Sequence, residues 1–202
     1  MKSLRPNVLA PLVGAAMLLS LTLAGCSNDA TTSAQFAASA TPPSPGLVKL
    51  AQRSVSGSQV LVDVLLNGPE PALDLYAFRF AIRISDTSAV RFVPQSSYVQ
   101  SVLVADTGQT IIFDVDASDP SELNIEVVKQ GGGAGNGLTS PAAVVIELTF
   151  EVLGSGGSAL SFSGIGASQP QAFDRARNPI EAVHFDTASA SLAGVRTGGG
   201  GY

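Results

Sequence analysis

Hydrophobic and polar side chains alternate strictly along residues 76–84, YAFRFAIRI. One side of this segment carries Tyr76, Phe78, Phe80, Ile82 and Ile84, and the other side carries Ala77, Arg79, Ala81 and Arg83. Successive side chains of a β-strand point to opposite faces of a sheet, so a period of two residues predicts a strand with one buried face. Because the segment is long and rich in aromatic residues, we expect it to lie in the centre of a sheet.

Eight further segments have the alternation or the β-branched composition of strands, and residues such as Gly, Pro, Asn and Asp separate them. They are residues 48–55, 59–66, 89–94, 110–115, 123–129, 143–152, 160–162 and 183–192. No stretch has a sustained apolar period of 3.6 residues, which would indicate a helix. The pattern therefore predicts one all-β domain of about nine strands, a sandwich or a barrel.

The first 25 residues have the features of a secretory signal peptide. Lys2 and Arg5 supply positive charge, and residues 8–23 form an apolar run that is too short for a transmembrane helix. The run ends in Leu23-Ala24-Gly25-Cys26. This ending resembles the lipobox of bacterial lipoproteins, in which the cysteine becomes the first mature residue and carries lipid.

This resemblance implies that lipid on Cys26 anchors the protein to the bacterial cell envelope. Several acyl chains, at about 0.8 kcal/mol for each buried methylene, would make the anchor effectively permanent. Ser27 follows the cysteine, whereas an Asp would retain the protein at the inner membrane in bacteria that use this sorting rule. We therefore expect the outer membrane or the cell surface. Cys26 is the only cysteine, so we expect no internal disulfide bond.

Composition divides the rest of the chain into three parts. Residues 26–45 are rich in Ser, Thr, Ala and Pro and carry a single charge at Asp29, which predicts a disordered linker after the lipidated cysteine. Residues 46–193 contain all the predicted strands and form the β-domain. Residues 194–202 are rich in Gly and are expected to be a disordered tail.

The order of features in the β-domain resembles a cohesin domain. The resemblance rests on a strand that ends in a polar turn, a long aromatic strand before an Asp, a short strand with Phe, a hydrophobic strand before Gly, and a polar turn before the last strand. These features are residues 60–66 with Asn67-Gly68, 78–84 with Asp86, 90–92, 144–152 with Gly154, and 173–180. The resemblance implies a nine-stranded antiparallel jelly-roll sandwich, similar in fold to bacterial cellulose-binding modules. It also implies a binding domain without enzyme activity, which holds a protein partner of dockerin type on one sheet face.

Four outward positions are the candidate contacts for such a partner. Alternation, not a matched motif, places Arg79 and Arg83 on the outer side of the central strand, and Asn124 and Glu126 on the outer side of residues 123–129. Long polar side chains on an exposed sheet face can form a protein interface. The alternative, that they are ordinary solvated positions, stays open.

Three carboxylates follow one another near the end of a predicted strand. Asp114 and Asp116 share a face, and Asp119 precedes Pro120. Carboxylate oxygens are the ligands that Ca²⁺ prefers, and a carboxylate pair can also act as a general acid and base. A solvated strand end and turn needs the same residues, since Asp favours turn starts. The sequence thus predicts no cofactor, with calcium at this cluster as the alternative.

Polysaccharide is the alternative ligand, because the related cellulose-binding modules hold sugar rings on flat exposed aromatic side chains. The chain has no Trp and three Tyr. Alternation places Tyr76 inward and Tyr202 lies in the tail, so Tyr98 is the one predicted platform. This shortage favours a protein partner over a sugar.

Charge and the lack of catalytic motifs exclude other classes. Without residues 1–25, nine basic residues stand against sixteen acidic ones, and no basic cluster remains to neutralise nucleic acid. The single histidine, His184, cannot form a histidine-rich metal site, and no Gly-x-Ser-x-Gly motif supports a nucleophile. The glycine-rich residues 131–137 lack the Lys and Ser or Thr of a phosphate-binding loop.

Overall fold

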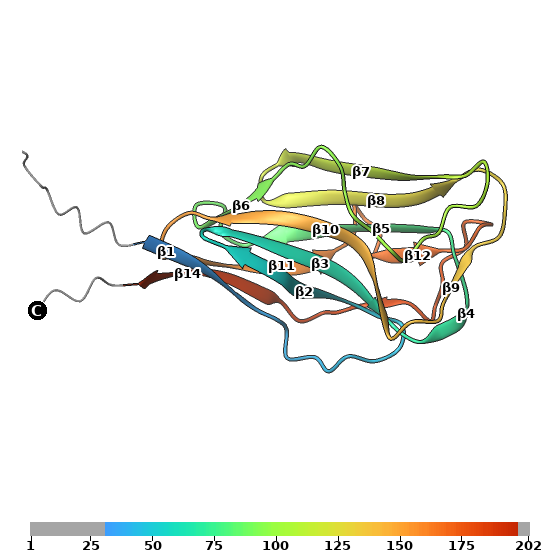
Figure 1. Ribbon diagram of the computed structural model, residues 1–202, viewed down its shortest axis with the longest axis horizontal. Coiled ribbons are helices and arrows are strands. Elements are labelled where there is room, and N and C mark those ends of the chain that lie inside the picture. The colour runs from blue at the N-terminus through green and yellow to red at the C-terminus, as the bar shows by residue number, and fades with distance from the viewer. Residues whose placement is uncertain (1–30, 198–202) are drawn as a thin grey trace, which may run out of the picture.

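A computed structural model describes residues 31–197, and these residues form fourteen strands arranged as a sandwich (Figure 1). Within this range there is no helix of the length and apolarity that a membrane span requires. The predicted all-β fold is confirmed. The predicted signal peptide and Cys26 lie outside the described residues.

Two large sheets build the sandwich. The first has the order β1 (Thr31–Ala37), β14 (Ala190–Thr197), β11 (Gly157–Ser163), β5 (Ala77–Ile84), β8 (Glu122–Gln130) and β7 (Thr110–Asp119), with β12 (Gln171–Phe173) also paired to β5. The second has the order β13 (His184–Phe185), β2 (Leu47–Ser56), β3 (Gln59–Asn67), β10 (Ala142–Val152) and β6 (Val90–Val93). A small ribbon joins β4 (Glu70–Leu75) to β9 (Asn136–Leu138). All pairs are antiparallel except β13 with β2.

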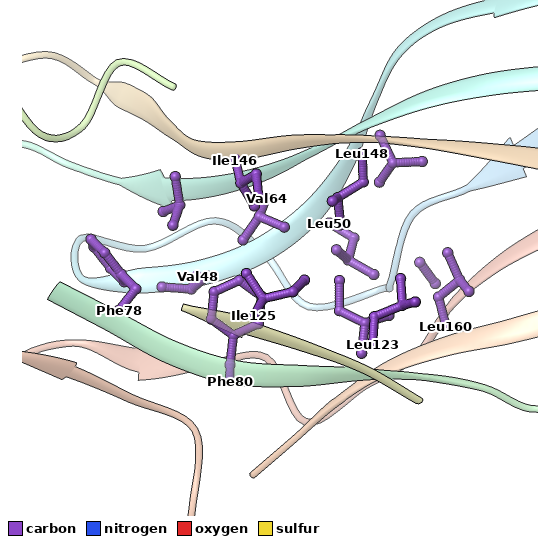
Figure 2. Packing of buried hydrophobic residues seen from close by; sticks show 14 of the residues in the cluster. Val48, Leu50, Val64, Phe78, Phe80, Leu123, Ile125, Ile146, Leu148 and Leu160 are labelled. Carbon is purple, nitrogen blue, oxygen red and sulfur yellow. The ribbon is translucent and has the colours of Figure 1, made fainter. Parts of the chain in front are cut away.

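The core lies between the two sheets, and β5 is central to it as predicted. Figure 2 shows side chains from both sheets meeting there, among them Val48, Leu50, Val64, Phe80, Leu123, Ile125, Ile146, Leu148 and Leu160. Phe80, Phe162 and Phe185 form a cluster of three rings with centroids 5.2–5.7 Å apart. Burying one such side chain contributes about 1.5–3 kcal/mol, so this cluster joins three distant chain segments strongly.

The predicted linker is wrong over residues 31–37, which form β1. This strand pairs with β14 along its whole length, from Thr31 opposite Thr197 to Ala37 opposite Ser191. Ala34 is buried and Phe36 packs against the core. Small residues with one aromatic have the composition of a linker, but their alternation gives an edge strand its buried side once a partner strand is present.

The predicted tail also begins too early, because β14 continues to Thr197. Gly194 lies inside this strand, where a Cβ atom would stand only 1.7 Å from the carbonyl oxygen of Gly154. The glycine therefore allows the strand to pass close to the turn between β10 and β11. Residues 198–202 lie outside the described residues.

Residues 38–46 connect β1 to β2, and hydrogen bonds to the carboxylate of Asp186 hold this segment against the sandwich. Asp186 accepts hydrogen bonds from the hydroxyls of Ser39 and Thr41, the latter at 2.7 Å, and the backbone N–H of Ala188 at 3.0 Å. Lys49 donates to the carbonyl oxygen of Thr41 at 2.6 Å. We call residues 38–46 the strap.

The sandwich has two different ends along its long axis (Figure 1). The start of β1 and the end of β14 lie side by side at one end, since Thr31 pairs with Thr197. The short strands β4, β9 and β12, which the sequence did not predict, lie toward the other end. One part of the candidate site, a groove lined by Phe173 of β12, lies toward this second end.

Candidate functional site

The outer face of the seven-stranded sheet carries its side chains in rows across the strands. We call the surface that β7, β8, β5, β11 and β12 turn away from the core the outer face. The register places Asp114, Glu126, Arg79 and Gln171 in one row, which we call the charged row. Further rows contain Asp116, Asn124, Ala81 and Ser163, and then Glu122, Arg83 and Ser161.

The four predicted contact residues all lie on this outer face. Arg79 forms an ion pair with Glu126, and Arg83 forms one with Glu122, each at 2.8 Å. The arginine side chains are 45% and 64% exposed. Ion pairs this exposed contribute about 0–1 kcal/mol, so both arginines can exchange their carboxylate for another one at little cost.

Asn124 occupies the middle of the face and is not fully hydrogen-bonded. Its Oδ1 atom and the Oγ atom of Ser163 are buried without a hydrogen-bond partner among the described residues. The register places these two residues on either side of Ala81. An unmade hydrogen bond of this kind costs about 1–3 kcal/mol, so the sheet gains no evident stability from having polar residues here.

A groove of about 650 Å³ adjoins the charged row. Its floor is a further cross-strand row, which we call the apolar row: Ile112 of β7, Val128 of β8, Ala77 of β5 and Phe173 of β12. Arg79, Glu126 and Asp114 form one wall. The apolar row thus lies between charged side chains and remains open to solvent, with Ile112 42% exposed.

Tyr76 lines this groove, so the prediction that it points into the core is wrong. It precedes the first residue of β5, is half-buried, and its hydroxyl donates a hydrogen bond to the carbonyl oxygen of Gly131. The alternation of the sequence begins at Tyr76, but β4 ends at Leu75 and β5 begins at Ala77. Tyr76 therefore lies at the junction of two strands, where alternation within a strand does not fix the direction of its side chain. The groove therefore has two aromatic side chains, Tyr76 and Phe173.

Tyr98, the one predicted sugar platform, is half-buried and packs against Phe113 with ring centroids 5.9 Å apart. Burial raises the pKa of its hydroxyl. Its ring is therefore used within the fold and does not offer an open flat face.

A tight turn forms the far edge of the groove. Asp174 accepts hydrogen bonds from the side chain and the backbone N–H of Asn178 at 3.0 and 2.8 Å, and these lower the pKa of the carboxyl. The N–H of Arg177 donates to the carbonyl oxygen of Asp174 at 3.0 Å. We call this segment the 174–178 turn. It presents Arg175 and Arg177, both exposed, beside Phe173.

The three predicted calcium ligands are not brought together. Asp116 accepts the N–H of Ser118 at 2.9 Å, Asp119 accepts the N–H of Ser121 at 2.8 Å, and these serines lower the pKa of both carboxyls. Across residues 31–197, no group of three or more His, Cys, Asp or Glu side chains is placed to hold a metal ion. The calcium alternative is therefore wrong for this cluster. Asp116 stabilises the irregular end of β7, Asp119 stabilises the turn that follows it, and Asp114 belongs to the groove wall.

Comparisons with known proteins bear on the fold. No protein-family model matches the sequence, and no curated protein matches it either. Among solved structures, the chain resembles the second type II cohesin module from the adaptor ScaA scaffoldin of Acetivibrio cellulolyticus, with a TM-score of 0.53 at 12% identity over 74% of this chain and 90% of that one.

Two further matches are also cohesin structures with low sequence identity to this chain. The type II cohesin dyad from the same scaffoldin gives a TM-score of 0.52 at 12% identity over 75% of this chain and 49% of that one. A type I cohesin–dockerin complex from Clostridium thermocellum gives 0.46 at 13% identity over 81% of this chain and 97% of the matched one. The likeness to the two type II cohesin structures confirms the predicted cohesin-like sandwich as a fold.

Proposed function

We propose that this chain is a cohesin-like docking module, which holds a protein partner of dockerin type on the outer face of its seven-stranded sheet. The observation that carries the proposal is the convergence of Arg79, Arg83, Asn124 and Glu126 on that face. Cohesins, which the strand order resembles, bind their partners on one sheet face. The absence of enzyme activity, which the resemblance implies, stays a prediction.

The chemistry of the outer face supports docking. Its arginines are held by weak, exposed ion pairs, so a carboxylate of a partner can replace an internal one. Arginine is also favoured in protein interfaces, because its planar group donates several hydrogen bonds in a fixed geometry. A polar, charged face beside an open apolar groove has the composition of an interface rim and core.

We further propose that lipid on Cys26 anchors the module to the bacterial cell envelope, at the outer membrane or the cell surface. The support is the ending Leu23-Ala24-Gly25-Cys26 after an apolar run, followed by Ser27. The lipid would be the contact with the membrane. Export in this way places a docking module where it can hold a second protein at the cell surface.

A polysaccharide remains the second candidate ligand. The observation that favours it is the placement of Tyr76 and Phe173 along the groove, since aromatic side chains beside polar groups are common in sugar sites. Both side chains are half-buried, and the hydroxyl of Tyr76 is also hydrogen-bonded to the carbonyl oxygen of Gly131, so neither presents a fully exposed ring. Protein docking therefore stands first.

The test is retention of a partner from the envelope and secreted fractions of the producing organism. The bait is the full chain carrying Cys26→Ser, which cannot take lipid, and the variant adds Arg79→Glu. The control adds Arg91→Glu, because Arg91 is also an exposed arginine paired with a glutamate across two strands, but on the other sheet.

We expect one protein to be retained by the bait and by the Arg91→Glu control, and at least tenfold less by the Arg79→Glu variant. Equal retention by all three baits would remove the outer face as the docking surface. Retention of insoluble polysaccharide, with no protein retained, would favour the second candidate.

A further inference from the structure

We propose that the side chains of Lys129 and Asn136 react with each other in the folded chain and form an isopeptide bond, with Asp106 as the group that moves the protons. The inference concerns a covalent modification inside one chain. It does not depend on the proposed function, because the reaction needs no partner.

Lys129 is a lysine on the core side of the sandwich. Leu123, Ile125 and Val127 of β8 point into the core, and the alternation continues that side to Lys129. Its side chain is 0% exposed. Lysine is seldom fully buried unless its amino group is paired. Protein atoms, and not water, therefore determine what this amino group can do.

The amino group of Lys129 meets an amide and a carboxylate. Its Nζ atom donates to the carbonyl oxygen of Ala134 at 2.9 Å and to Oδ1 of Asn136 at 3.1 Å. The Oδ2 atom of Asp106 lies 3.5 Å from the same Nζ. An amine is a nucleophile, an amide carbon is its electrophile, and a carboxylate can carry the protons between them. These are the three groups that the formation of an amide bond requires.

The side-chain carbonyl of Asn136 is polarised for attack. Its Oδ1 accepts the hydrogen bond from Lys129 and a second one from the backbone N–H of Val104 at 3.1 Å. The N–H of Val104 can keep this bond while negative charge develops on the oxygen. Because a C=O bond is about 1.23 Å long, the Nζ atom lies at most about 4.3 Å from the carbon atom to be attacked. A small movement of the lysine side chain brings it to the reacting distance of about 3–3.5 Å.

The backbone around Asn136 is held firmly in place. The N–H of Gly135 donates to Oδ1 of Asp74 at 2.7 Å. A Cβ atom at Gly135 would stand 2.2 Å from that oxygen, and one at Gly137 would stand 2.2 Å from the carbonyl oxygen of Pro71. β9 therefore lies close against β4, and the amide stays beside the amine. Such positioning is a large part of the acceleration of reactions between two groups of one molecule.

The loop that carries Asp106 is tied to the glycine-rich loop beside Lys129. The N–H of Asp106 donates to Oε1 of Gln109 at 2.8 Å, and the side-chain amide of Gln109 donates to the carbonyl oxygen of Gly132. Gln109 is buried, whereas the side chain of Asp106 is 64% exposed. The carboxylate thus reaches the buried amine from one side and solvent from the other, which gives a leaving group its way out.

The reaction balances without an oxidant, a reductant or a cofactor. Asp106 takes one proton from the ammonium of Lys129, and the lone pair of the neutral amine forms a bond to Cγ of Asn136. Asp106 then returns the proton to Nδ2, the bond between Cγ and Nδ2 breaks, and ammonia leaves. The ammonia takes the second proton from the new amide nitrogen, so the products are an amide and an ammonium ion, and Asp106 is again a carboxylate.

The experiment is a tryptic digest of the denatured full chain carrying Cys26→Ser, which we call the parent, read by mass spectrometry. Trypsin cleaves after a free lysine but not after one whose amine is part of an amide. An unlinked chain gives the peptides 92–129 and 130–175. A linked chain gives one peptide, 92–175, whose mass is lower than that of its sequence by one ammonia.

This readout distinguishes the isopeptide bond from another loss of ammonia. The backbone nitrogen of Gly137 can also attack the side chain of Asn136 and form a ring. That reaction leaves Lys129 free, so trypsin still cleaves there and the lower mass appears on the peptide 130–175.

We expect the parent to give the linked peptide and Asn136→Ala to give none. Asp106→Asn should reduce the linked fraction at least tenfold, because general acid–base catalysis is lost while an exposed side chain of the same shape is kept. Asp114→Asn is the matched control, since Asp114 is an exposed carboxylate on the neighbouring strand β7, and it should be linked as fully as the parent.

Cleavage of the parent after Lys129, with both unlinked peptides at full mass, would overturn the inference and leave this lysine as a hydrogen-bonded clamp between two loops. A linked fraction that Asp106→Asn does not change would overturn the role of Asp106 in the reaction.

Discussion

At the scale of single residues, Asp186 holds the strap to the sandwich. It is 4% exposed, and a carboxylate buried this deeply is stable only with hydrogen-bond partners. Burial by itself would raise the pKa of Asp186. The hydroxyls of Ser39 and Thr41, the N–H of Ala188 and the charge of Lys49 together outweigh burial and hold this pKa below its ordinary value.

This lowered pKa predicts a specific dependence of stability on pH. The folded form binds the proton of Asp186 less readily than the unfolded form does, so the carboxylate stabilises the fold above the ordinary Asp pKa of about 3.9. That contribution is lost as the pH falls through this value towards the lower pKa of the folded state. We expect Asp186→Asn to lower the free energy of unfolding by about 2 kcal/mol at pH 7, through loss of charge-assisted hydrogen bonds.

The measurement is urea unfolding of parent and variant at pH 7 and at pH 3. The difference between the two proteins should shrink on acidification, because the unfolded parent then binds a proton at Asp186 more readily than the folded parent does. Asp114→Asn is the matched control, since Asp114 is exposed, and it should change stability at neither pH. A gap between parent and Asp186→Asn that is constant with pH would show that the charge of Asp186 does not matter.

At the scale of strands, the sequence predicted the elements that have strong alternation and missed those that depend on distant partners. β5, β8 and β10 carry long apolar sides, and this pattern is local. β1 consists mainly of small residues and is a strand only because β14 lies beside it. β4, β9 and β12 are short, and each pairs with a segment far away in the chain.

The candidate site likewise has one part that local alternation predicts and another part that depends on distant segments of the chain. The outward positions of Arg79, Arg83, Asn124 and Glu126 follow from alternation within two predicted strands. The groove could not be predicted, because Phe173 and the 174–178 turn come from a segment about a hundred residues beyond Tyr76. Only the register of β12 on β5 brings them together.

The role of β1 can be tested by moving the start of the chain. A protein that begins at Gly46, where the composition places the domain boundary, lacks β1 and most of the strap. It exposes the edge of β14 and loses the packing of Ala34 and Phe36. We expect it to be less stable by about 2–4 kcal/mol and prone to association, since an uncovered edge strand pairs with other chains.

Thermal unfolding and size-exclusion chromatography, with a protein of residues 31–197 as control, provide the measurement. Equal melting temperatures and equal elution volumes would show that β1 adds nothing to the domain.

At the scale of the whole molecule, the proposed function places the membrane anchor at one end of the sandwich and the groove toward the other end. Four residues separate Cys26 from the start of β1, and an extended chain spans at most about 3.5 Å per residue. A lipid on Cys26 would therefore hold the β1 and β14 end of the sandwich within about 18 Å of the membrane surface. The groove lies toward the opposite end and would face away from the membrane.

Lipidation itself is tested by Cys26→Ser in the producing organism. We expect the parent chain in the detergent-extracted membrane fraction and the variant in the soluble or secreted fraction, because the acyl chains provide the membrane affinity. Mass spectrometry of the parent should show the added lipid mass on Cys26. A variant that stays with the membrane would contradict the proposal.

The pairing of β1 with β14 also determines how the anchored module would respond to force. A pull on a partner held near β12, against an anchor that precedes Thr31, acts along the strands. The inter-strand hydrogen bonds of an antiparallel pair are perpendicular to the strands, so this load shears them. Seven residue pairs then have to give way together, rather than opening one after another as in peeling. The terminal strand, composed largely of small residues, would thus be the mechanical link between the cell and whatever it holds.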